Sequence, residues 1–155
     1  MNRIELHCIE STVSEFQHEL KILIDGEDLI DKLKEWENKL TSQKSIIGSY
    51  SGLLPYMLSE GRPELLLLQG LPVEDYWDEN ALILVCDGCA VAGCWDMRAI
   101  VELDTETVIW KDFRQPHRSE ESSEYWDYTN FGPFVFDKKQ YFTTLEQVQK
   151  LRPEK

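Results

Sequence analysis

The stretch from Asn80 to Arg118 constrains the fold of this chain more than any other part of the sequence. It opens with an unbroken apolar run, Ala81 to Val85, which is typical of a strand covered on both faces or of a short buried helix. The run is short and Cys-Asp-Gly follows it directly, and both features favour a strand. We therefore expect a central buried strand here, with the rest of the chain packed around it.

Two more strands are expected later in this stretch. Met97 to Leu103 and Val108 to Trp110 are mostly apolar, and the short polar segment Asp104 to Thr107 between them suits a hairpin turn. Pro116 has no backbone N–H to donate, so the strand ladder should end near it.

The first half of the chain carries both sheet and helix patterns. Apolar and polar residues alternate over positions 3–8 and 16–24, which predicts two half-buried strands. Apolar residues then recur at helical spacing over positions 28–40, with acidic residues near the start. The short apolar run Leu65 to Gln69 is interpreted as a further strand.

Near the C-terminus, six aromatic residues fall between Tyr125 and Phe136. So many large rings cannot all face water without forming a sticky patch, so we expect them to pack against the hairpin that holds Trp95 and Trp110. Phe134 to Phe136 reads as a short strand.

A last helix is expected over positions 137–151, with Asp137 as its N-cap and Gln140 at the capping-box position. Together these elements predict a single α+β domain over residues 1–155. Its sheet should be mainly antiparallel with five to seven strands, and one helix should lie in the N-terminal half and one at the C-terminus. A chain of 155 residues fits one such domain.

The charge of the chain excludes some classes of function. There are 29 acidic against 16 basic residues, a net charge of −13, and the excess is greatest before residue 80. Nucleic-acid binding is disfavoured because it requires Lys and Arg to neutralise phosphates. No apolar run approaches the roughly 20 residues of a membrane helix, and the first residues lack a signal-peptide core, so a cytoplasmic location is expected.

An acidic surface is able to steer a basic protein into encounter. We predict such a partner, with Asp28, Asp31 and Glu35 on the exposed face of the first helix as contributors. The competing interpretation is that the charge only keeps the protein soluble.

Three cysteines and a histidine form the sharpest chemical pattern. Cys86 and Cys89 are separated by two residues, Cys94 follows, and His117 lies beyond the hairpin. The pattern is compatible with a zinc site, a redox pair or a Cys–His nucleophile. No Cys or His stands at the expected fourth zinc position, however, so we expect reduced thiols packed beside the sheet, with no metal, no disulfide and no cofactor.

A small basic cluster follows the hairpin. Arg114, His117 and Arg118 are suited to holding a carboxylate or a phosphate. They are equally suited to neutralising nearby acids such as Asp112 and Glu120.

Three motifs support a resemblance. They are Gly93-Cys94-Trp95, the segment Trp110 to Arg118 with its Gln-Pro-His-Arg ending, and the segment Trp126 to Asp137 with its Gly-Pro-Phe core. In these motifs, residues 82–145 resemble a family of small uncharacterised bacterial proteins of unknown function. The resemblance implies a bacterial cytoplasmic protein and brings with it no activity, cofactor or catalytic residue.

The leading hypothesis from the sequence is therefore a non-enzymatic acidic binding or interaction module, similar to immunity or regulatory proteins, without catalytic residues. The alternative is a small enzyme or zinc protein that uses Cys86, Cys89, Cys94 and His117.

Overall fold

A computed structural model describes residues 1–11, 13 and 16–150 of the chain. It confirms the α+β class: antiparallel strands form two sheets, and three α-helices and three short 3-10 turns accompany them. The elements in chain order are β1 (Ile4–Glu10), β2 (His18–Ile24), β3 (Glu27–Asp28), α1 (Leu29–Glu37), η1 (Lys44–Ile46), β4 (Tyr50–Ser51), η2 (Pro55–Leu58), α2 (Pro63–Leu68), β5 (Ala81–Cys86), β6 (Met97–Leu103), β7 (Thr107–Arg114), η3 (Pro116–Arg118), β8 (Phe134–Asp137) and α3 (Lys138–Gln149).

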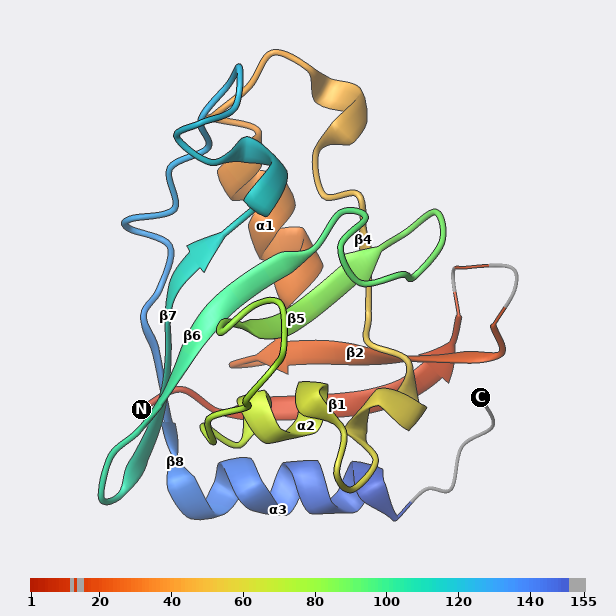
Figure 1. Cartoon of the computed structure of the whole chain (residues 1–155), viewed down its shortest axis with the longest axis vertical. Coiled ribbons are helices and arrows are strands. Elements are labelled where there is room, and N and C mark those ends of the chain that lie inside the picture. Colours follow the sequence, from red (N-terminus) through yellow and green to blue (C-terminus); the bar gives the residue numbers. More distant parts are fainter. Residues whose placement is uncertain (12, 14–15, 151–155) are drawn as a thin grey trace.

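Two isolated bridges join the two sheets. One sheet has the order β1-β2-β3 and the other the order β4-β5-β6-β7-β8. A parallel bridge between Asn2 and Phe136 links the start of the chain to β8, and an antiparallel bridge between Leu20 and Leu53 links β2 to the segment after β4. The strands therefore curl into a ring around one core, with α3 beside β1 at one end and α1 at the other (Figure 1).

The expected central strand is present. All five residues from Ala81 to Val85 are at most 1% exposed, and β5 pairs with β4 on one side and β6 on the other. β6 and β7 form the expected hairpin, closed by a hydrogen bond of 2.9 Å from the N–H of Asp104 to the carbonyl of Thr107. β7 ends at Arg114, two residues before Pro116.

The strand predicted at Leu65 to Gln69 is wrong, because this segment is helix α2. A short apolar run is compatible with either structure, and its boundaries decide here for the helix. Pro63 occupies the first turn, where its missing N–H costs nothing. Gly70, at φ 77°, ends the helix, and the N–H of Leu71 bonds to the carbonyl of Leu66 at 3.0 Å in a Schellman motif.

The predicted N-cap of the last helix, Asp137, is present, and Asp28 caps α1 in the same way. Asp28 accepts a hydrogen bond of 2.8 Å from the N–H of Ile30, and Asp137 accepts one of 3.0 Å from the N–H of Gln140. The Gln140 side chain does not complete a capping box but bonds to both backbone groups of Ile4. This contact ties α3 to β1 and helps to close the ring.

The aromatic segment packs as expected. Trp126 is 2% exposed and meets Trp95 edge to face at 6.0 Å. Trp110 lies edge-on to Phe136 at 5.2 Å, and its Nε1 donates to the Tyr141 hydroxyl at 3.0 Å. This segment therefore joins the hairpin to α3 through the core.

Within the described part of the chain, no helix is both long enough and apolar enough to cross a membrane.

Candidate functional site

The three predicted cysteines converge. Cys86 ends β5, Cys89 lies in the following turn and Cys94 stands shortly before β6. Because β5 and β6 are antiparallel neighbours, the segment between them returns to its starting point. The three Sγ atoms lie within 4.8 Å of one another, and no other His, Cys, Asp or Glu in residues 1–11, 13 and 16–150 joins the group.

The turn from Cys86 to Ala90 arranges the first two thiols. The N–H of Ala90 donates to the carbonyl of Cys86 at 2.9 Å, and the N–H of Gly88 donates to the Cys86 sulfur at 3.4 Å. Ala90 has a φ of 56°, a left-handed conformation that closes the turn. The N–H at the sulfur stabilises negative charge on it, as a metal-bound thiolate requires.

The Cys94 thiol interacts with both of the other thiols. Hydrogen bonding to Cys89 and then to Cys86 raises the pKa of the Cys94 thiol to about 12. A metal ion that binds here must therefore displace protons from the thiols. Cys94 is exposed and the other two are half-buried, so the cluster opens to solvent.

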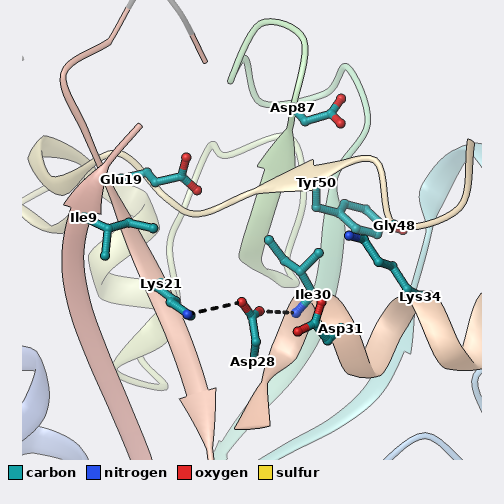
Figure 2. A pocket seen from close by; sticks show the side chains of 10 residues that line it. All are labelled: Ile9, Glu19, Lys21, Asp28, Ile30, Asp31, Lys34, Gly48, Tyr50 and Asp87. Atoms are coloured by element: carbon teal, nitrogen blue, oxygen red, sulfur yellow. Dashed lines mark hydrogen bonds and ion pairs between the residues drawn. The ribbon is translucent and has the colours of Figure 1, made fainter. Parts of the chain in front are cut away.

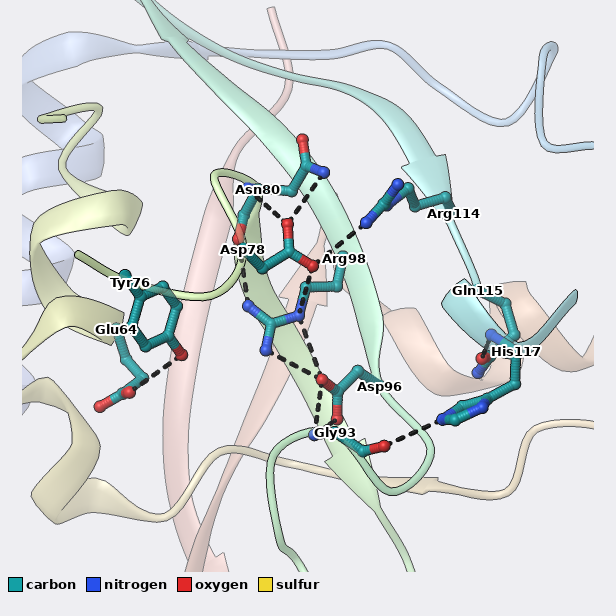
Figure 3. Close-up of polar contacts among 10 residues, drawn as sticks. All are labelled: Glu64, Tyr76, Asp78, Asn80, Gly93, Asp96, Arg98, Arg114, Gln115 and His117. Carbon is teal, nitrogen blue, oxygen red and sulfur yellow. Dashed lines mark hydrogen bonds and ion pairs between the residues drawn. The ribbon is translucent and has the colours of Figure 1, made fainter. Parts of the chain in front are cut away.

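Two contacts to Gly93 hold the loop that carries Cys94. Both carboxylate oxygens of Asp96 accept the Gly93 N–H at 2.9 Å, and the Nε2 of His117 donates to the Gly93 carbonyl at 2.9 Å (Figure 3). Asp96 is buried, and its Oδ2 also accepts hydrogen bonds from Nε and Nη2 of Arg98 at 3.1 and 2.9 Å. The loop is thus fastened to β6 on one side and to η3 on the other.

Arg98 is completely buried and its charge is balanced locally. Asp78 lies 3.6 Å from its Nε and also pairs with Arg114 at 3.1 Å. The Trp77 ring covers the guanidinium at 4.3 Å, and the carbonyl of Asn80 accepts one further hydrogen bond. Sequence reasoning missed this network, although an arginine in a mostly apolar strand was a signal for it.

The predicted basic cluster does not form one site. His117 stacks on Trp95 at 5.7 Å, and Arg118 lies 5.0 Å from the Trp95 ring and 5.5 Å from the Trp126 ring. Arg114 turns instead to Asp78. Stacking of His117 and the cation–π contacts of Arg118 give these two side chains a positioning role beside the thiol loop.

Two of the three predicted acidic residues, Asp28 and Asp31, line a cavity of about 350 Å³ between β2, α1 and β4 (Figure 2). Asp28 caps α1 and lies 3.9 Å from Lys21, while Asp31 shares the lining with Lys34. Glu35 is exposed and does not contribute to the lining. The cavity therefore carries both signs of charge.

A buried carboxylate lies between α1, β4 and the aromatic segment. Glu37 accepts hydrogen bonds from the N–H of Gly48 at 2.9 Å and from the hydroxyls of Tyr50 and Tyr128 at 2.7 and 2.6 Å. Burial raises the pKa of Glu37, and the three donors partly offset this effect. The network joins three segments of the chain, and we interpret its role as structural.

Comparison with known proteins adds no relative: no family model matches the chain, and neither the curated proteins nor the solved structures contain a significant match. The resemblance to a bacterial family therefore stays a prediction.

Proposed function

We propose that this protein binds a thiophilic metal ion, with Zn²⁺ as the first candidate, through the thiolates of Cys86, Cys89 and Cys94. The observation that carries the proposal is the convergence of the three Sγ atoms within 4.8 Å. With Zn–S bonds of about 2.3 Å, tetrahedral geometry places sulfurs about 3.8 Å apart. The thiols therefore need to approach one another by no more than about 1 Å. Thiolate ligands select Zn²⁺, Cu⁺ or iron over hard cations.

The loop supports this proposal because contacts within the protein hold it in position. Asp96 and His117 hold Gly93, and the backbone of the turn holds Cys86. The three cysteines are not members of the apolar core. Metal would bind to a site that is already arranged, in contrast to small zinc domains, which unfold without it.

Metal analysis of protein purified under reducing conditions without a chelator tests the proposal. We expect one Zn²⁺ per chain, and loss of it when Cys86, Cys89 or Cys94 is replaced by Ser. Cys8→Ser is the matched control, because Cys8 is an exposed free thiol on β1, outside the cluster. Zinc content that is substoichiometric, or that falls equally in the Cys8 variant, contradicts the proposal.

We further propose a cytoplasmic location, because a reducing compartment keeps thiols available to a metal. A basic protein partner remains a separate proposal, supported by the net charge of −13. Its support is weaker, because Asp28 is already engaged in capping α1 and the surrounding surface also carries Lys21 and Lys34.

A further inference from the structure

One edge of β6 has no partner strand over the second half of its length. β5 begins at Ala81, which faces Ala99, whereas β6 continues to Leu103, so the β6–β7 hairpin extends past the start of β5 (Figure 1). Before β5 the chain turns, because Oδ1 of Asp78 accepts hydrogen bonds from the backbone N–H and the side-chain amide of Asn80 at 2.9 and 3.1 Å. Among residues 1–11, 13 and 16–150, no other strand or bridge pairs with β6 on this side.

Two residues of this edge direct their backbone groups outward. Hydrogen-bonded and non-hydrogen-bonded pairs alternate along an antiparallel ladder. The N–H of Asp104 bonds to the carbonyl of Thr107 at 2.9 Å, which closes the hairpin with a hydrogen-bonded pair. The pairs that Leu103 and Val101 form with β7 are therefore non-hydrogen-bonded. The backbone N–H and C=O groups of these two residues point away from β7, where a further strand is able to pair with them.

A groove lies beside this edge. A cavity of about 380 Å³ is lined by the end of α2, by residues 70–73 and by Ile100 and Val101 of β6. Its lining also includes Ala81, the first residue of β5, so the cavity lies where a longer β5 would continue. Leu71 and Ile100 are 45% and 38% exposed, although both are large and apolar. This cavity, which we call the β6 groove, is suited to apolar side chains of an added strand.

The rim of the β6 groove is acidic. Residues 63–97 contain no Lys or Arg. Glu74, Asp75 and Glu79 are exposed in this segment, and Glu79 lines the cavity. Lys111, on β7, is already paired with Glu102 at 3.2 Å. A segment with basic residues beside its apolar ones therefore complements the groove, whereas a second copy of this chain would bring the same acidic rim against it.

We infer that the edge of β6 at Val101 and Leu103 pairs with an extended segment of a basic protein partner, whose apolar side chains enter the β6 groove. When a peptide adds a strand to an exposed edge, backbone hydrogen bonds supply affinity and pockets for alternate side chains supply specificity. The inference does not depend on the metal site. It gives the basic partner proposed from the net charge a docking surface other than α1.

Titration of ¹⁵N-labelled protein with three capped peptides tests the inference. The first has the sequence Lys-Val-Lys-Val-Lys-Val, which places basic and apolar side chains on opposite faces of a strand. The second is the same peptide with every backbone nitrogen methylated, which keeps the charges but removes the donors. The third has Glu in place of Lys. We expect the first peptide to shift the amide resonances of Val101 and Leu103 and to slow their hydrogen exchange. The other two should bind at least about tenfold more weakly at low salt.

A matched pair of variants assigns the site. Ile100→Lys places a positive charge in the β6 groove and should weaken binding of the first peptide about tenfold. Val91→Lys adds the same charge in the segment that follows the other end of β5 and should leave the affinity nearly unchanged. Both residues are exposed, by 38% and 58%, so both variants should fold, and their amide spectra check this.

Each other result overturns the inference in a different way. Equal affinity for the methylated peptide excludes strand pairing. Resonance shifts confined to α1 exclude the groove and leave a basic partner standing as a proposal. Amides of Val101 and Leu103 that are protected without peptide, and lose protection on dilution, show that a second copy of the chain occupies the edge. Absence of binding by the first peptide also overturns the inference, while the zinc content of the same protein decides the proposed function independently.

Discussion

Replacing Asp96 by Asn should both destabilise the fold and weaken the metal site. Asn keeps the shape of the side chain, but only one of its two terminal atoms is able to accept the Gly93 N–H, which bonds to both Asp96 oxygens at 2.9 Å. What is lost is the negative charge beside Arg98, whose guanidinium is completely buried and donates twice to Asp96 Oδ2.

The magnitude follows from the burial of the pair. Removing one partner of a buried ion pair costs about 3–5 kcal/mol, because the remaining charge is left uncompensated. Asp78 stays 3.6 Å from the Nε of Arg98, which places the expected loss of unfolding free energy near the lower value, about 3 kcal/mol. Arg114→Ala is the matched control: it breaks a pair with the same Asp78, but its side chain is 51% exposed, so the cost should be about 0–1 kcal/mol.

Urea unfolding followed by tryptophan fluorescence measures both values. Zinc affinity of the folded variant, measured by competition with a chromophoric chelator, should fall about 10–100-fold, as is usual when a residue that positions a ligand is altered. A loss of unfolding free energy no larger than that of Arg114→Ala would refute the account of the buried charge. A stability loss without any change in zinc affinity would show that Asp96 does not position the Cys94 loop.

Four further results are expected. Trp126→Ala should cost about 3–5 kcal/mol of unfolding free energy, because the ring is 2% exposed, and an unchanged urea midpoint would place it on the surface in solution. Burial raises the pKa of Glu37 above 4.5, so the folded state holds this proton more tightly than the unfolded state does. The contribution of Glu37 to stability is therefore largest below pH 4.5 and is lost as pH rises through the raised pKa. Glu37→Gln does not titrate, so its unfolding free energy should increase relative to that of the unaltered protein as pH rises through the raised pKa. Chelation of the metal should leave the far-ultraviolet circular dichroism spectrum unchanged, whereas loss of the spectrum would make the metal part of the fold. If a basic partner exists, its capture at low salt should weaken at high salt and in Asp31→Lys and Glu35→Lys, and capture indifferent to both changes would leave the acidic face a solvated surface.

Local patterns were sufficient for most of the fold. Alternation identified β1 and β2, the apolar run identified β5, and the carboxylates of Asp28 and Asp137 marked the starts of two helices. The run of leucines in α2 was misassigned because burial on all sides erases the periodicity that separates helix from strand. The boundaries Pro63 and Gly70 carried the missing information.

The site was only half determined by sequence. The order Cys86, Cys89, Cys94 showed which atoms were available, and the spacing of the first two already favoured a turn that brings thiols together. Whether Cys94 and His117 lie close to Cys86 and Cys89 depended on how the strands that follow pack against β5. The sequence placed no limit on this, because contacts between distant residues depend on packing and not on local preference.

Tertiary structure decided the positions of Cys94 and His117 and the burial of Arg98, and long-range contacts explain all three. Pairing of β5 with β6 brings Cys94 back to Cys86, while His117 stacks on Trp95, bonds to Gly93 and is not a member of the cluster. Arg98 is buried because Asp78, Asp96 and the Trp77 ring surround it, three partners that no periodicity in β6 reveals. A residue's burial and charge environment are properties of its neighbours in space, and these exist only once the ring of strands has closed.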